Sequence, residues 1–261
     1  MLRRDVVISE LAYDVLWELG VDTDKHVALF CPSPGATWTE RERLAHQVVG
    51  ELQQLGLAQG DRPDPDLMDA LQLLARPEVE VYGWFAVGDR PTESVVVAVS
   101  GREGVLAHLG GGQLRLRPVA PEWLCDAAVS VLPPLRPIRG QHHNVPTELL
   151  EGGPGRHGND DDDGGGVLES VGGGETEVDR VRRLLAQPRR AAGQFFAATR
   201  GPAGGRRRCE YPVNVVDTAE GCYLAHQVRG GDGQPWTVVV PTDQRVLAER
   251  LGQLVHGLSG R

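Results

Sequence analysis

One short stretch of the chain contains the spacings most suggestive of ligand chemistry. Residues 153–158 read Gly-Pro-Gly-Arg-His-Gly and so satisfy the G-x-G-x-x-G spacing of a dinucleotide-binding loop. Such a loop works only between a strand and the N-terminus of a helix, where backbone amides and the helix dipole meet the pyrophosphate. No strand or helix pattern flanks residues 153–158, so we interpret them as an ordinary loop.

The next residues resemble the start of a calcium-binding loop. Residues 159–164 place side-chain oxygens at alternate positions and a glycine at the sixth. The twelfth position is Ser170 instead of the bidentate glutamate that calcium requires, and Glu169 falls one residue short. No helical pattern precedes the run. We therefore expect weak, non-specific cation binding at most.

Four histidines are candidate metal ligands: the neighbours His142 and His143, and the pair His108 and His226, which occur in similar sequence contexts. A metal site needs three or four convergent donors, and no Cys or His pair has the spacing of zinc ligands. We interpret His108 and His226 as equivalent strand ends and predict no metal site.

The cysteines give no sign of catalysis or of a disulfide framework. They are far apart and lie in apolar segments, which is typical of reduced thiols in a cytosolic protein: Cys31, Cys125, Cys209 and Cys222. Cys125 is predicted to be a core residue of a helix and not a nucleophile, and no Gly-x-Ser-x-Gly motif is present. The sequence therefore predicts a protein that is not an enzyme and has no cofactor.

The overall charge excludes further classes of partner. A net charge of −9 argues against general nucleic-acid binding, which needs clustered positive charge. The single basic run, residues 206–208, is predicted to be a solvated hairpin loop. No segment approaches the ~18 consecutive apolar residues of a membrane span, and Asp5 and Glu10 interrupt any signal sequence. We expect a cytoplasmic protein without membrane insertion.

Hydrophobic periodicity predicts an α+β chain. Helical spacing and capping residues favour helices over residues 10–20, 39–56, 64–76, 121–132 and 175–186. Period-two and β-branched patterns favour strands over residues 6–8, 26–31, 79–87, 94–100, 105–109 and 113–119. Residues 138–174 contain little that could pack, so we predict a flexible Gly/Asp-rich acidic linker there.

Short matches at element boundaries indicate an internal repeat. Leu-Leu-Ala-Arg-Pro at 73–77 is matched by Leu-Leu-Ala-Gln-Pro at 184–188, and Gly-Trp-Phe at 83–85 by Gly-Gln-Phe-Phe at 193–196. Leu-Ala-His recurs at 106–108 and 224–226. When Pro118 is aligned with Pro241, the apolar positions of the helices that follow also coincide.

The repeat predicts a quasi-twofold fold. We expect a central antiparallel β-sheet with flanking helices, formed by an N-terminal half (1–137) and a C-terminal half (175–261). The repeat units within them are residues 64–132 and 175–255. One unit alone would bury too little apolar surface, so we expect the two halves to form one composite domain.

Several of these segments resemble one known family, the EspG proteins. They are the opening Val-Val-Ile-Ser of 6–9 running into the helix of 10–17, the Pro-Ser-Pro-Gly turn of 32–35, the Gly-Trp-Phe of 83–85 and the Leu-Ala-His stretches. The resemblance covers nearly the whole chain except 138–174. It implies a quasi-twofold α+β fold and a cytosolic chaperone of type VII (ESX) secretion without cofactor or catalysis.

The resemblance also implies a partner and a place for it. The partner would be a secreted helical pair, PE–PPE-like or WXG-type, which the chaperone keeps soluble for export. By analogy with the family, the contacts would involve the C-terminal helical part and one loop between strands of the first half: Val87, Gly88, Asp89, Arg90, Pro91, Thr92 and Glu93. Three alternatives stay open: an ordinary hairpin connection at that loop, a binding or scaffold module of the same fold with another protein partner, and an enzyme with a dispersed site.

Overall fold

The computed structural model describes residues 1–151, 176–201, 204–231 and 233–259. Its helices in that part of the chain are α1 (Glu10–Gly20), η1 (Val27–Leu29), α2 (Trp38–Gln54), α3 (Pro65–Ala75), η2 (Pro121–Trp123), α4 (Leu124–Val129), α5 (Thr147–Glu151), α6 (Glu177–Leu185) and α7 (Gln244–Ser259). The strands of the first half are β1 (Val6–Ser9), β2 (Ala58–Gln59), β3 (Arg62–Pro63), β4 (Val79–Val87), β5 (Glu93–Ser100), β6 (Glu103–Gly110) and β7 (Gln113–Pro118). Those that follow are β8 (His143–Pro146), β9 (Arg189–Arg200), β10 (Arg206–Arg208), β11 (Val213–Thr218), β12 (Gly221–Arg229) and β13 (Pro235–Pro241).

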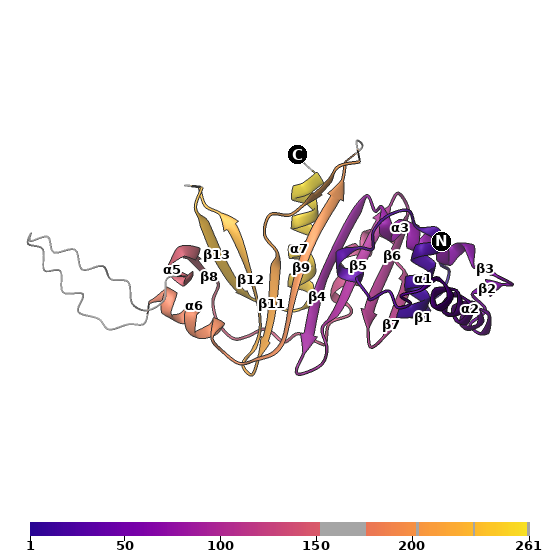
Figure 1. Cartoon of the computed structure of the whole chain (residues 1–261). Coiled ribbons are helices and arrows are strands. Elements are labelled where there is room, and N and C mark those ends of the chain that lie inside the picture. The colour runs from indigo at the N-terminus through magenta and orange to yellow at the C-terminus, as the bar shows by residue number, and fades with distance from the viewer. Residues whose placement is uncertain (152–175, 202–203, 232, 260–261) are drawn as a thin grey trace, which may run out of the picture.

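One large antiparallel sheet joins the two halves. Its order is β1-β7-β6-β5-β4-β9-β11-β12-β13-β8, and β10 adds to one end of β9. The central pair, β4 with β9, therefore joins the first-half meander to the second-half meander (Figure 1). The predicted α+β fold with a central antiparallel sheet and flanking helices is confirmed.

The centre of the sheet shows a reciprocal arrangement of glycine and phenylalanine. Gly83 pairs with Phe195 across the β4–β9 ladder, and Phe85 pairs with Gly193. A Cβ atom at Gly83 would lie 2.3 Å from the backbone oxygen of Gln194 and 2.8 Å from the Phe195 ring. Each glycine thus leaves room for the ring or backbone opposite it, and a larger residue at either position would clash with that neighbour.

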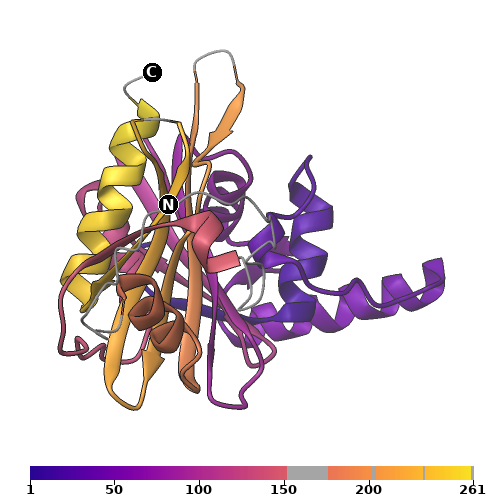
Figure 2. The same cartoon turned by 90° about the vertical axis from the view of Figure 1, so that its left-hand side faces the viewer.

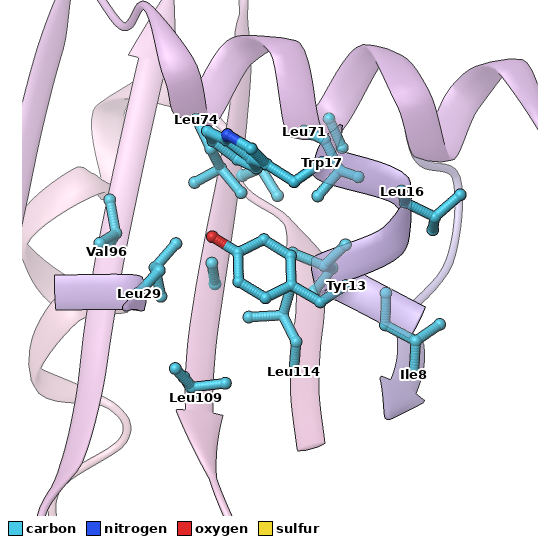
Figure 3. Close-up of a cluster of buried hydrophobic side chains, with 14 of the residues drawn as sticks. Ile8, Tyr13, Leu16, Trp17, Leu29, Leu71, Leu74, Val96, Leu109 and Leu114 are labelled. Atoms are coloured by element: carbon cyan, nitrogen blue, oxygen red, sulfur yellow. The ribbon is translucent and has the colours of Figure 1, made fainter. Parts of the chain in front are cut away.

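Helices cover both faces of the sheet. On one face, α1, α3 and η1 pack over the first-half strands, and α5 and α6 lie over the second-half strands at the other end (Figures 1 and 2). On the opposite face, α4 and α7 cover the central strands. The largest of these interfaces surrounds Tyr13 of α1, where Ile8, Leu29 and Leu114 come from three other segments (Figure 3).

Local sequence explains where the first helices begin. The Ser9 hydroxyl accepts a hydrogen bond from the Ala12 amide at the start of α1. Thr37 and Glu40 form a capping box at α2, and Asp64 caps α3 just before a proline at its first position. These caps occupy backbone donors that the first turn of a helix leaves without partners.

Two predicted elements differ in the structure. The strand expected over residues 26–31 is wrong: residues 27–29 form the 3₁₀ helix η1, which packs on β5 and accepts a hydrogen bond from Ser94 at the Ala28 carbonyl. Pro32 and Pro34 follow and cannot donate to a ladder. The helix expected over 121–132 is shorter, a 3₁₀ turn (η2) followed by α4.

The segment predicted as linker, 138–174, also differs at its start. Residues 143–146 form β8, which pairs with β13, and residues 147–151 form α5. Val145 is buried in one cluster with Val181 of α6 and Val239 of β13, so this segment is part of the core of the second half. Ahead of β8, the Ile138 amide donates a hydrogen bond to the Cys222 carbonyl of β12 at 3.0 Å. Residues 152–174 of the predicted linker, which include the G-x-G-x-x-G and calcium-like runs, lie outside the described residues.

The strand order is the same on both sides of the central pair, as the predicted repeat requires. Val105 pairs with Pro118 between β6 and β7, and Tyr223 pairs with Pro241 between β12 and β13. These are the positions that the sequence alignment equates. It stays a prediction that the two repeat units superpose residue on residue. The division of the chain into equivalent halves, 1–137 and 175–261, stays a prediction as well.

Within the described residues, no helix is long and apolar enough to cross a membrane.

The glycine at the centre of the sheet gives a test of this packing. We expect Gly83→Ala to lower the free energy of unfolding by about 3 kcal/mol, because the new methyl group overlaps the backbone of β9. Gly50→Ala is the matched control: that glycine is within α2 and has nothing within 4 Å of a new Cβ, so stability should rise by up to about 1 kcal/mol. Urea unfolding measures both, and equal effects would contradict the proposed close approach.

Candidate functional site

The sheet face between the two groups of helices contains a hollow, here called the central groove. It has a volume of about 470 Å³, and its floor is formed by β4, β9 and β11, with the C-terminal end of α6 as one wall. The residues that line it include Trp84, Ala86, Thr92, Leu185, Arg189, Ala192, Gln194, Asn214 and Val216. Both halves of the chain contribute to it, so it exists only when the sheet is assembled.

Trp84 is the aromatic residue that this groove presents. It is only half-buried, while the neighbouring Tyr82 and Phe196 are buried. The Trp84 ring meets both of them edge-on, with centroids 5.9 Å from Tyr82 and 6.2 Å from Phe196. Tyr82 and Phe196 stack on each other at 5.4 Å. This packing fixes one side of the Trp84 ring and leaves the rest available for contact.

Beside Trp84, the groove floor is polar. The Gln194 side-chain amide donates a hydrogen bond to Asn214 at 3.0 Å, and both side chains reach the surface. A rigid aromatic ring next to amides that can donate and accept is the chemistry of a protein-binding surface. The groove contains no group of acid, base and nucleophile that would support catalysis among its described residues.

A buried ion pair lies beside the aromatic residues on the same face of the sheet. Glu80, whose side chain is 2% exposed, accepts a hydrogen bond from Arg206 Nε at 2.6 Å. His26 Nε2 lies 3.4 Å from the other carboxylate oxygen. Burial alone would raise the pKa of Glu80, but attraction to His26 and Arg206 outweighs it, so the pKa lies below its ordinary value. Glu80 is therefore ionised at neutral pH.

Residues 206–208, predicted to be a solvated hairpin loop, are exposed, but they form a strand and not a loop. These residues form β10, and Arg206 and Arg208 lay their guanidinium groups over the rings of Tyr82 and Phe196, at 5.3 and 5.0 Å. An arginine run that looks solvated in sequence thus covers buried aromatic rings. No local pattern indicates this, because the partner Glu80 is 126 residues away.

The seven residues predicted to bind a partner lie at the turn between β4 and β5. Val87 and Glu93 belong to these strands, while the five residues between them, 88–92, are exposed. Thr92 lines the central groove with Trp84, and Leu185 of the C-terminal half lines it from α6. Glu93 is engaged elsewhere, in a contact of 2.6 Å with His108. Partner binding by these residues stays a prediction.

The candidate metal ligands do not converge. The described residues contain no group of three His, Cys, Asp or Glu side chains placed to hold a metal. His108 contacts Glu93, whereas His226 is buried near Arg250 of α7, and burial lowers its pKa to about 4. The four cysteines are free thiols, and burial raises the pKa of Cys125 to about 11, which suits a core residue.

Comparisons with known proteins agree with this fold. A family model described as the EspG family matches residues 9–253. Among solved structures, the Mycobacterium tuberculosis type VII secretion system chaperone EspG5, in complex with a PE25–PPE41 dimer, matches with a TM-score of 0.67. The match covers 96% of this chain and 95% of that chain at 15% sequence identity. No curated protein matches the sequence.

The ion pair of Glu80 with Arg206 predicts an asymmetric mutational response. Arg206→Ala leaves the Glu80 carboxylate buried with only His26 nearby. We expect the free energy of unfolding to fall by about 2–3 kcal/mol, which is less than for a fully buried pair because Arg206 is partly exposed. Adding Glu80→Gln should recover part of that loss, since the stranded charge is removed. Arg115→Ala, an exposed arginine of β7, is the control and should change stability by under about 0.5 kcal/mol. Urea unfolding distinguishes these results, and a neutral Arg206→Ala would contradict the ion-pair argument.

Buried His226 predicts a pH dependence. The unfolded chain binds a proton at this residue near pH 6.5, whereas the folded pKa is about 4, so the unfolded state takes up the proton first. Stability should therefore fall as pH decreases below 6.5, by about 2 kcal/mol between pH 7 and 5 from this residue. His226→Gln should flatten the profile over that range. An unchanged slope in the variant would contradict a buried, neutral His226.

Proposed function

The chain belongs to the EspG family, and from that membership we propose that it is a cytosolic chaperone of type VII (ESX) secretion. It binds a secreted helical pair of the PE–PPE kind and keeps that pair soluble for export. The observation that carries the proposal is the family match over residues 9–253. The fold shared with EspG5, which was solved in complex with a PE25–PPE41 dimer, supports it.

We place the partner on the central groove. The end of a helical pair presents apolar side chains that lose contact with water when they meet a half-buried ring such as Trp84. Gln194 and Asn214 can pair with backbone groups freed at the helix ends. Thr92 and Leu185, from the predicted loop and from α6, would contact the sides of the pair.

Keeping the partner soluble follows from the same contact. An apolar helical tip exposed in the cytosol would associate with other copies, and covering it removes that surface from water. Release for export requires only that the tip dissociate from the chaperone, and no covalent bond is formed or broken. This explains why the proposal includes no cofactor and no catalytic step.

The proposal predicts that groove substitutions weaken binding. Trp84→Ala should reduce affinity for the co-expressed PE–PPE pair by roughly 30-fold, the effect of losing a central aromatic contact. Gln194→Arg places a long cation on the exposed groove floor without disturbing the core, and should weaken binding by at least about tenfold. Isothermal titration with the purified pair measures both.

The control for these variants is Trp123→Ala, which removes an exposed tryptophan located outside the groove, and binding should be unchanged. Wild-type affinity in both groove variants would show that the pair binds to another surface of the chaperone. Isolation of the native protein with a stable partner that is not a secreted helical pair would instead support the alternative, a binding module of the same fold.

A further inference from the structure

We propose that a second groove, between α1 and the start of α2, docks a segment of another protein in which an apolar anchor is flanked by lysine or arginine. This N-terminal groove has a volume of about 850 Å³ and shares no lining residue with the central groove. The proposal therefore does not depend on the chaperone function.

Exposed aromatic side chains mark the N-terminal groove. Trp38 is 90% exposed at the first residue of α2, and Phe30, 74% exposed, stands across the same hollow. Trp17 closes the inner wall, where its indole N–H donates to the Thr23 carbonyl at 2.7 Å. Two large rings so exposed in one hollow are unusual on a monomeric surface and are the kind of side chains that dominate binding energy at interfaces.

The floor of this groove is held by a charge network that is internally satisfied. The buried carboxylate of Asp14 accepts a hydrogen bond from Arg41 at 2.6 Å and is also bonded by Lys25 and Ser33. Arg41 Nε donates to Glu18 at 2.6 Å as well. The network fixes the turn that precedes Trp38. It also pairs both cationic side chains that line the groove, Arg41 and Lys25, the latter being the only lysine of the chain.

The charge that remains among the residues lining this groove is negative. Asp24 lines it, and its exposed carboxylate makes no ion pair among the described residues. Asp22 precedes it in the same loop with an exposed carboxylate that is likewise without an ion pair there, while its backbone carbonyl accepts a hydrogen bond from Arg76 at 3.5 Å. Helix α1 points its C-terminal, electronegative end at this loop and has no basic residue in its last turn. The surface therefore complements a cationic partner.

The negative charge at the N-terminal groove determines which kind of binding partner fits it. A second copy of the chain would bring a net charge of −9 and the same acidic loop, and an anionic small molecule would meet the same repulsion. A protein segment with an aliphatic or aromatic anchor between basic residues satisfies both features, since the anchor fits between the rings and the cations meet the acidic rim.

A defined peptide tests the inference on the full chain. The probe is a fluorescein-labelled, 14-residue amphipathic peptide of leucine and lysine, titrated by fluorescence anisotropy at about 0.1 M salt. Two matched peptides replace all lysines with glutamate or all leucines with serine. We expect the Leu/Lys peptide to bind and each matched peptide to bind at least tenfold more weakly.

Variants then locate the site. Trp38→Ala and, separately, Phe30→Ala should each weaken binding of the Leu/Lys peptide at least tenfold, and Asp22→Asn with Asp24→Asn should weaken it and reduce its salt dependence. Leu149→Ala and Trp123→Ala, which remove exposed apolar side chains elsewhere, should leave it unchanged. Because Phe30 and Trp38 are exposed, circular dichroism should show both variants folded.

Three results would overturn the proposal. One is no binding of the Leu/Lys peptide, and another is equal binding of the Ser/Lys peptide, which would mean diffuse attraction to an acidic chain. The third is wild-type affinity in both the Trp38 and the Phe30 variants. None of these results bears on the PE–PPE experiment, so the two proposals can fail separately.

Discussion

The pairing of β4 with β9 is the constraint on which the rest of the molecule depends. It runs from Val79 opposite Thr199 to Val87 opposite Ala191, and it closes an edge strand from each half that would otherwise expose a full row of backbone donors and acceptors. The same ladder brings Tyr82 onto Phe196, so it also creates the aromatic cluster beside the central groove. Without this pairing, neither half would have a complete sheet and the central groove would not form.

The ion pair of Glu80 with Arg206 adds specificity to that pairing more than stability. Removing two charges from water costs about as much as their attraction returns, so an apolar pair at this place would be equally stable. A shift of β9 by one residue, however, would turn its side chains to the opposite face and carry the attached β10 away from Glu80. The buried carboxylate would then lose its guanidinium, and only one register avoids that cost. We therefore interpret this pair as a register device across the two halves.

The sequence predicted elements well where the determining contacts are local. Strand β4 and the helices that begin after Ser9, Thr37 and Asp64 follow from caps and periodicity. Predictions failed where contacts with residues distant in sequence determine the local structure. Residues 27–29 form a turn of 3₁₀ helix because they pack on β5, and Arg206 is ion-paired because Glu80 lies next to it in the fold. The central groove could not be predicted for the same reason. Trp84 was visible as a strand residue, but its partial exposure depends on which helices cover the sheet.

The two grooves differ in what assembles them. The central groove takes residues from β4, β9, β11 and α6, so it requires both halves in register. The N-terminal groove is built within residues 14–41, by a helix end, a turn and one local charge network. Loss of the β4–β9 pairing would therefore remove the first surface, whereas no residue lining the second comes from either strand. A chaperone built in this way would hold a cargo on the central groove only while the two halves are paired in register.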